Sequence, residues 1–161
     1  KVFSDGKDIY QMDDDSLAIF RRRQIGLIYQ FYNLIPILNV EENITLPCDL
    51  DNQKVEKQRL NTLLQSLGLE NRRTHLPNEL SGGQQQRTSI GRAMITNPSI
   101  ILADEPTGNL DSKSSDEIVN LLKKSNKEYK QTIIMITHNI EIAKIADRII
   151  EIEDGKIVRE S

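Results

Sequence analysis

One octapeptide in this chain has the residue types of an anion-binding site. It reads Leu80-Ser81-Gly82-Gly83-Gln84-Gln85-Gln86-Arg87, so a hydroxyl and two glycines open a polar helical stretch. Without side chains on Gly82 and Gly83, a phosphate can approach the backbone N–H groups at a helix N-terminus, where the helix dipole favours negative charge. The alternative is a helix cap with a flexible Gly-Gly turn. The octapeptide therefore predicts a phosphate site or, more simply, a capped helix.

Two adjacent carboxylates form a second candidate site. Asp104 and Glu105 follow an apolar run over residues 99–103, which is typical of a parallel strand buried on both faces. Ligands of open α/β sheets bind at the C-terminal ends of such strands. A carboxylate suits Mg²⁺, and a second one beside it can position water for phosphoryl transfer. The alternative for an Asp-Glu pair is ordinary surface charge.

A histidine ends the next apolar run in the chain. Residues 132–137 predict a second buried strand, and His138 follows it. A lone histidine at a strand end is more often a hydrogen-bonded structural residue than a catalytic one. His75 has no comparable context, and we expect it to be structural.

The elements that must position these residues follow from hydrophobic periodicity and from Gly and Pro punctuation. The pattern predicts an α/β order, with a helical or irregular block over residues 33–96. Helices are expected at 13–23, 55–67, 83–96, 112–129 and 140–146, strands at 25–29, 99–103 and 132–137, a C-terminal hairpin at 148–159, and a turn at 4–6.

Composition bounds the class of protein. A length of 161 residues favours one globular domain, and a net charge of -3 argues against wholesale nucleic-acid binding. The apolar runs are too short to span a bilayer, so we expect membrane association only through a partner.

Cys48 is the only cysteine, which indicates a reducing compartment and most simply a buried or neutral thiol. Residues 21–23 are three arginines that could touch phosphates or lipid headgroups, although a solvated helix end is the simpler interpretation.

Taken together in order, these motifs resemble the nucleotide-binding subunit of an ABC transporter. The resemblance covers nearly the whole chain. Five motifs carry it: Gln30 after residues 25–29 as the Q-loop, Leu80 to Gln84 as the signature sequence, residues 100–105 as the Walker B strand, Gly108-Asn109-Leu110-Asp111 as the D-loop, and His138 as the switch histidine. The resemblance implies a RecA-like parallel sheet core, formed by residues 1–32 and 98–161, with a helical subdomain at residues 33–97.

The resemblance also implies a role for each matched residue in ATP hydrolysis. Asp104 would help to hold Mg²⁺, and Gln30 would sense the metal and the γ-phosphate. Glu105 would polarise the attacking water, and His138 would contact the γ-phosphate and that water. Electrostatic positioning is the main contribution expected in such a site.

A second ATP-binding subunit is the first partner that the resemblance implies. Ser81, Gly82, Gly83 and Gln84 would clasp the ATP bound to that subunit in a head-to-tail dimer. Asp111 would lie at the dimer seam and couple the two sites.

A transmembrane permease is the second implied partner. Residues 31–36 and 40–44 are similar to subunits of antimicrobial-peptide resistance and lipoprotein-release exporters. In the family, the segment after the Q-loop glutamine receives the permease, so Phe31, Tyr32 and Leu34 would face it, unless they pack within the helical subdomain. The expected location is cytoplasmic, on the inner face of the cell membrane.

The largest departure from the family is that no G-x-x-x-x-G-K-[ST] phosphate loop occurs in the 161 residues. In the family this loop precedes the Q-loop by tens of residues, so we expect it upstream of Lys1. This chain by itself is then expected to bind ATP weakly or not at all. The alternative is a non-catalytic module that dimerises and offers its signature motif in trans. Chromosome- and ribosome-acting relatives are disfavoured, because only 50 residues separate Gln30 from Ser81.

Overall fold

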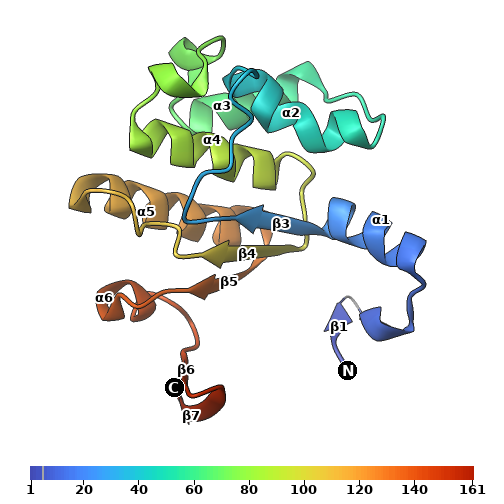
Figure 1. Ribbon diagram of the computed structural model, residues 1–161, viewed down its shortest axis with the longest axis vertical. Coiled ribbons are helices and arrows are strands. Elements are labelled where there is room, and N and C mark those ends of the chain that lie inside the picture. Colours follow the sequence, from blue (N-terminus) through green and yellow to red (C-terminus); the bar gives the residue numbers. More distant parts are fainter. Residues whose placement is uncertain (5) are drawn as a thin grey trace.

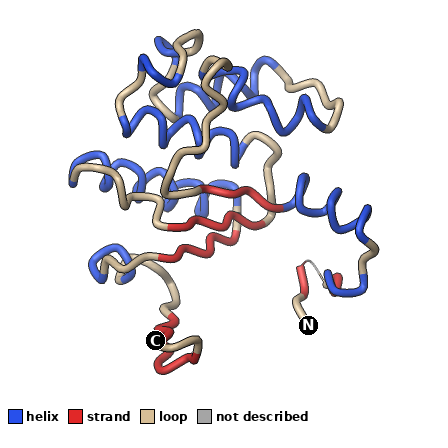
Figure 2. Tube along the Cα trace, in the orientation of Figure 1, coloured by secondary structure: helices blue, strands red, loops and turns tan. Residues whose placement is uncertain are grey.

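Three parallel strands form the centre of the computed structural model, which describes residues 1–4 and 6–161. The strands are β3 (Ile25–Ile28), β4 (Ile100–Asp104) and β5 (Thr132–Ile136), with β4 in the middle. Because the strands are parallel and in register, their C-terminal ends meet at one edge of the sheet (Figure 2). The α/β fold class expected from the sequence is confirmed.

Helices cover one side of this sheet, as Figure 1 shows. The β-α-β-α order expected after residue 98 is confirmed by β4, α5, β5 and α6. The α-helices are α1 (Asp14–Gln24), α2 (Val40–Leu50), α3 (Lys57–Ser66), α4 (Gly82–Met94), α5 (Ser112–Tyr129) and α6 (Ile140–Ala143), with short 3₁₀ turns at Ile9–Gln11, Glu70–Arg72 and Pro77–Glu79.

Two small antiparallel hairpins lie near the chain ends. One pairs β1 (Phe3–Ser4) with β2 (Lys7–Asp8), and the other pairs β6 (Ile150–Glu153) with β7 (Lys156–Glu160), as expected from the sequence. The turn expected at residues 4–6 includes Asp5, which lies outside the described residues.

Helix α2 is the element that hydrophobic periodicity did not separate from its surroundings. Its start is a capping box, in which the Asn39 side chain accepts from the Glu42 N–H and the Glu42 carboxylate accepts from the Asn39 N–H. Pro47 lies inside the helix and masks its pattern in the sequence. Helix ends elsewhere differ from expectation by a few residues, as for α3, which begins at Lys57.

The expectation that the strands are buried on both faces is wrong for residues 132–137 and half right for residues 99–103. On β5, Ile133 and Met135 pack against the core, whereas Ile134 and Ile136 are 53% and 63% exposed. Alternate residues of a strand face opposite sides of the sheet, and the described helices α4 and α5 cover only one of those sides. The other side leaves an apolar sheet face open.

One hydrophobic core joins the sheet to the helices above it. Its members include Ile44, Leu64, Ile90, Ile101 and Ile118, each 1% exposed or less. Helix α4 comes so close to β3 that a β-carbon on Gly26 would lie 2.5 Å from the Ala93 carbonyl oxygen. The position of α4 over the sheet is therefore set by a glycine as well as by apolar packing.

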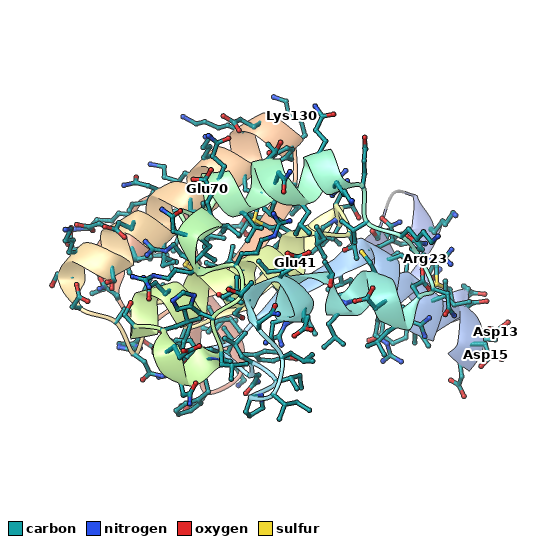
Figure 3. The ribbon with its side chains drawn as sticks, turned by 90° about the horizontal axis from the view of Figure 1, so that it is seen from above. Asp13, Asp15, Arg23, Glu41, Glu70 and Lys130 are labelled. Atoms are coloured by element: carbon teal, nitrogen blue, oxygen red, sulfur yellow. The ribbon has the colours of Figure 1, made fainter. Side chains whose placement is uncertain are left out.

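Helix α1 carries acidic side chains in its first turn and arginines in its last turn. Figure 3 shows Asp13 and Asp15 at its outer end and Arg23 where it joins the rest of the molecule. Arg22 and Arg23 both bind the Asp51 carboxylate, at 2.9 and 2.8 Å, while their side chains are 41% and 50% exposed. This helix end is therefore partly solvated and also forms an ion pair with the end of α2. Among the described residues, no helix has the length and apolar character needed to cross a bilayer.

Cys48 lies in the buried face of α2. Burial raises the pKa of its thiol. The expected burial of this cysteine is therefore confirmed.

Candidate functional site

Glu105 and His138 meet at the C-terminal edge of the sheet. Glu105 follows β4, and its N–H donates to the Ile136 carbonyl at the end of β5 over 3.0 Å. Its Oε1 accepts from the His138 N–H at 2.8 Å and lies 2.6 Å from His138 Nδ1. The side chain of Glu105 is 18% exposed and that of His138 is 81% exposed. The largely buried carboxylate of Glu105 is thus hydrogen-bonded to the exposed side chain of His138.

The backbone of Glu105 is strained in a way that aims its side chain. Its φ is +43°, a left-handed value that is costly for a residue with a β-carbon. This turn, which lies directly before Pro106, directs the carboxylate to β5. Positive φ at a non-glycine residue concentrates at functional sites, and here the strained residue is one that the sequence singled out.

Asp104 is the last residue of β4 and is exposed. Its carboxylate makes no hydrogen bond or ion pair among the described residues, so it has free capacity for a hard cation. No group of three or more potential metal-binding side chains gathers in residues 1–4 and 6–161. This donor set fits Mg²⁺, which is usually held by one or two carboxylates together with substrate phosphates. That Asp104 and Glu105 reach one ligand stays a prediction.

Gln30 lies just beyond the end of β3, beside the loop that follows Glu105. Asn109 Nδ2 donates to the Gln30 carbonyl at 3.0 Å, and a β-carbon on Gly108 would lie 2.8 Å from Gln30 Nε2. Gly108 therefore makes room for the Gln30 side chain. The sheet order brings Gln30, Glu105 and His138 to the ends of three neighbouring strands.

The signature sequence forms a capped helix start. Ser81 Oγ accepts from the Gln84 N–H at 3.3 Å, and Gln84 Oε1 accepts from the Ser81 N–H at 2.9 Å. Gly82 and Gly83 are the first two residues of α4 and neither has a positive φ, so the flexible Gly-Gly turn is wrong and the helix cap is confirmed. The N–H groups of Gly82 and Gly83 have no partner among the described hydrogen bonds, which leaves them available to an anion.

Two side chains that the sequence did not connect with the signature lie against its glycines. A β-carbon on Gly82 would be 2.9 Å from the Tyr32 hydroxyl oxygen, and one on Gly83 would be 3.1 Å from Ser114 Oγ. The two glycines therefore also leave space for the Tyr32 and Ser114 side chains, in addition to exposing their N–H groups. No periodicity or motif could reveal these two contacts, because they join residues 50 and 31 positions apart in the chain.

Asp111 caps helix α5. Its carboxylate accepts from the Ser114 N–H at 2.9 Å and from Ser114 Oγ at 2.8 Å. The backbone bond first and the hydroxyl bond second hold the pKa of Asp111 below its usual value. Ser114 therefore connects Asp111 to Gly83 through one side chain.

Asn43 shapes the loop beyond Gln30, a role that no motif or periodicity indicates. It is fully buried in α2, its Oδ1 accepts from the Ile35 N–H at 2.8 Å, and its Nδ2 donates to the carbonyls of Ile35, Leu38 and Asn39. The loop held in this way exposes apolar side chains, with Phe31 at 70% and Ile37 at 83% exposure.

The sequence profile described as ABC transporter matches residues 1–108. The chain belongs to the ABC transporter family. It is 43% identical to the ABC transporter ATP-binding protein MJ0796 of Methanocaldococcus jannaschii, over 99% of this chain and 71% of that protein. It is also 42% identical to the lipoprotein-releasing system ATP-binding protein LolD of Cytophaga hutchinsonii, over 94% of this chain and 70% of LolD.

The chain is also similar to a longer protein and to a solved dimer. It is 48% identical to the macrolide export ATP-binding/permease protein MacB of a Shewanella species, over 97% of this chain and 24% of MacB. The solved dimer of the MJ0796 cassette in a post-hydrolysis state, bound to ADP and Pi, superimposes with a TM-score of 0.86 at 42% identity, covering 99% of this chain and 71% of that one. The expected ABC ATPase fold is confirmed.

Proposed function

We propose that this chain is the ATP-hydrolysing part of an ABC transporter that powers export through a membrane permease. The observation that carries the proposal is the pairing of Glu105 with His138, with Gln30 at the end of the neighbouring strand. Phosphoryl transfer to water needs a positioned nucleophile and compensation of charge, and these three side chains meet that need.

In the proposed reaction each side chain has one task. Glu105 accepts a hydrogen bond from the attacking water and polarises it, and His138 keeps that carboxylate and the γ-phosphate aligned. Asp104 and Gln30 hold Mg²⁺ with its water shell. The metal, when bound, neutralises charge on the phosphate oxygens.

A second copy of an ATP-binding subunit completes the site in this proposal. Ser81, Gly82, Gly83 and Gln84 clasp the ATP of that partner, and Asp111 lies at the seam. Support comes from the free N–H groups of Gly82 and Gly83, and from the dimeric state of the solved MJ0796 cassettes.

The permease is proposed to dock on the loop after Gln30. The exposed Phe31 and Ile37 provide apolar surface there, and Leu34 lies half-buried between them. The name of MacB joins an ATP-binding part to a permease in one protein, and that of LolD refers to lipoprotein release. The cassette is then placed on the inner, cytoplasmic face of the membrane.

Residues outside this chain are proposed to supply the phosphate loop, since the 161 residues contain none. The 161-residue chain mixed with Mg²⁺ and ATP in a calorimeter is expected to give little or no heat of binding. Micromolar binding would show that its own residues suffice to hold the nucleotide.

The hydrolysis proposal is tested in a protein that joins these residues to a phosphate loop. Glu105→Gln is expected to lower ATP turnover by about a hundredfold or more, the scale of a lost general base, while ATP binding remains. The matched control is Glu128→Gln, an exposed carboxylate near the end of α5. Equal turnover by the wild type and Glu105→Gln would refute the proposal.

A non-catalytic module is the second candidate, favoured by the absence of a phosphate loop. Such a chain would associate with an intact cassette only when ATP is present, and Gly82→Asp would abolish that association. Calorimetry of the mixture with and without ATP decides the matter. Failure to associate under both conditions excludes it.

A further inference from the structure

The loop that carries Gln30 is held by side chains that reach it from other elements. The Tyr29 carbonyl accepts from Gln86 Nε2 at 3.4 Å, and the Gln30 carbonyl accepts from Asn109 Nδ2 at 3.0 Å. The carbonyls of Tyr32 and Asn33 accept from Arg92 at 2.9 and 2.6 Å. Two of these three donors, Gln86 and Arg92, lie on α4, the helix that begins with the signature glycines.

Arg92 uses its guanidinium for this loop alone. It makes no ion pair among the described residues, and both of its side-chain hydrogen bonds there go to adjacent backbone carbonyls. The left-handed turn at Asn33, with φ +48°, accompanies this arrangement. A planar fork with two parallel donors suits a pair of neighbouring carbonyls, and the single ammonium of lysine does not.

Gln86 makes a buried bridge between three segments. It is fully buried, and its Nε2 lies between the Tyr29 carbonyl at the end of β3 and the Pro106 carbonyl, at 2.6 Å, directly after Glu105. Its Oε1 is buried without a partner among the described residues. An orphaned buried oxygen lowers stability, so an amide here is better explained by the geometry that it imposes than by the stability that it adds.

One side chain of the same loop, that of Tyr32, also lies against the signature sequence at Gly82. The Tyr32 hydroxyl oxygen lies 2.9 Å from the position of a β-carbon on Gly82. The loop therefore contacts α4 in two ways: its backbone carbonyls accept from Arg92, and the Tyr32 side chain lies against Gly82. For Tyr32 this contact favours the second of the two expected placements, packing within the helical subdomain, over exposure to a permease.

We propose that Arg92 and Gln86 are positioning residues that tie the Gln30 loop to the signature helix, so that Gln30 and the Gly82 N–H keep a fixed relation within one chain. This inference rests on the proposed function, because only in an ATPase do both groups act on phosphate.

Hydrogen exchange of the 161-residue chain tests the tie without any nucleotide. In Arg92→Met, the amides of residues 30–35 are expected to exchange at least about tenfold faster, while peptides of α5 exchange as in the wild type. Arg59→Met is the matched control, because Arg59 donates to the Met94 carbonyl at the other end of α4 and does not contact the loop. An unchanged loop, or an equal acceleration throughout the chain, would overturn the proposal.

A kinetic readout separates positioning from stability. In an ATP-hydrolysing assembly that contains this chain, Arg92→Met is expected to lower kcat by about tenfold with KM for ATP unchanged, because the loop is misplaced while the nucleotide still binds. Gln86→Met, which keeps the side-chain length, serves if Arg92→Met does not fold, and is expected to behave alike. A loosened loop with an unchanged kcat would overturn the positioning role, whereas an assembly without any ATPase activity would count against the proposed function and leave the exchange result standing.

Discussion

Glu105 Oε1 lies 2.6 Å from His138 Nδ1, and the two residues come from the ends of adjacent parallel strands. The same oxygen also accepts from the His138 N–H, so the carboxylate contacts both the backbone and the ring of His138. A carboxylate that orients an imidazole in this manner sets which ring nitrogen faces outward. Since Nδ1 faces Glu105, Nε2 is the ring nitrogen on the outward side.

His138→Ala is expected to separate catalysis from stability. Because the His138 side chain is 81% exposed but bonds the largely buried Glu105 carboxylate, its removal should lower the free energy of unfolding by no more than about 1 kcal/mol. ATP turnover of a phosphate-loop-containing protein should fall by about tenfold or more. Urea unfolding and a turnover assay measure the two quantities. His75→Ala is the control that should leave turnover unchanged, and a His138→Ala protein with full turnover would contradict the assigned role.

Gly26→Ala is expected to destabilise the fold by about 1–3 kcal/mol, because its β-carbon would lie 2.5 Å from the Ala93 carbonyl oxygen, and backbone cannot move aside cheaply. Gly83→Ala is the comparison, since there only the Ser114 hydroxyl, at 3.1 Å, has to adjust. Urea unfolding should rank Gly26→Ala well below Gly83→Ala in stability. The reverse order would mean that α4 is not placed by its approach to β3.

Tyr32 and Gly82 are expected to be energetically coupled. Gly82→Ala crowds the Tyr32 hydroxyl, and Tyr32→Phe removes the crowded oxygen. In a double-mutant cycle of unfolding free energies, the coupling should be at least about 0.5 kcal/mol, with Tyr32→Phe relieving part of the cost of Gly82→Ala. Strict additivity of the two substitutions would show that the residues do not touch in solution.

Asn43→Leu is expected to destabilise the chain by about 3 kcal/mol, because it leaves the Ile35 N–H and the Leu38 carbonyl without a described partner. The Ile35 and Asn39 carbonyls each lose one donor and keep the backbone N–H groups of Leu38 and Asn43. Asn61→Leu, at an exposed position of α3, is the control and should change little. Unfolding in urea gives both values. A stable Asn43→Leu protein would mean that the loop keeps its shape by other contacts.

Acid is expected to weaken the junction between α1 and α2 through Asp51. The hydrogen bonds from Arg23 and then Arg22 hold the pKa of Asp51 below its ordinary 3.8. A lowered pKa in the folded state stabilises the fold above pH 3.8, and this contribution is lost as the pH falls through the lowered value. The urea midpoint of Asp51→Asn should thus lie below that of the wild type at pH 7, and the difference should shrink below pH 3.8. Asp147→Asn is the control, and a difference that does not vary with pH would contradict the assignment.

The order of motifs along the chain was sufficient to predict the family, the α/β class and most helix and strand positions. These are local properties. The apolar run before Asp104, the Gly-Gly helix start and the periodicity of residues 112–129 each depend on neighbours within a few turns of chain. For the same reason the capping of α4 by Ser81 and Gln84 follows from their spacing of three residues.

Long-range contacts were decided only by the tertiary structure. Arg92 donates to the Tyr32 and Asn33 carbonyls, and Tyr32 lies against Gly82, although no periodicity relates these residues. The left-handed φ of Glu105 is likewise not visible in the sequence. Burial on one face of β5 alone is also a tertiary property, because it depends on which helices cover the sheet. The sequence by itself determined which residues could do chemistry. The pairing of β3, β4 and β5 brought Gln30, Glu105 and His138 to one edge of the sheet, and the packing of α4 placed the signature glycines beside Tyr32.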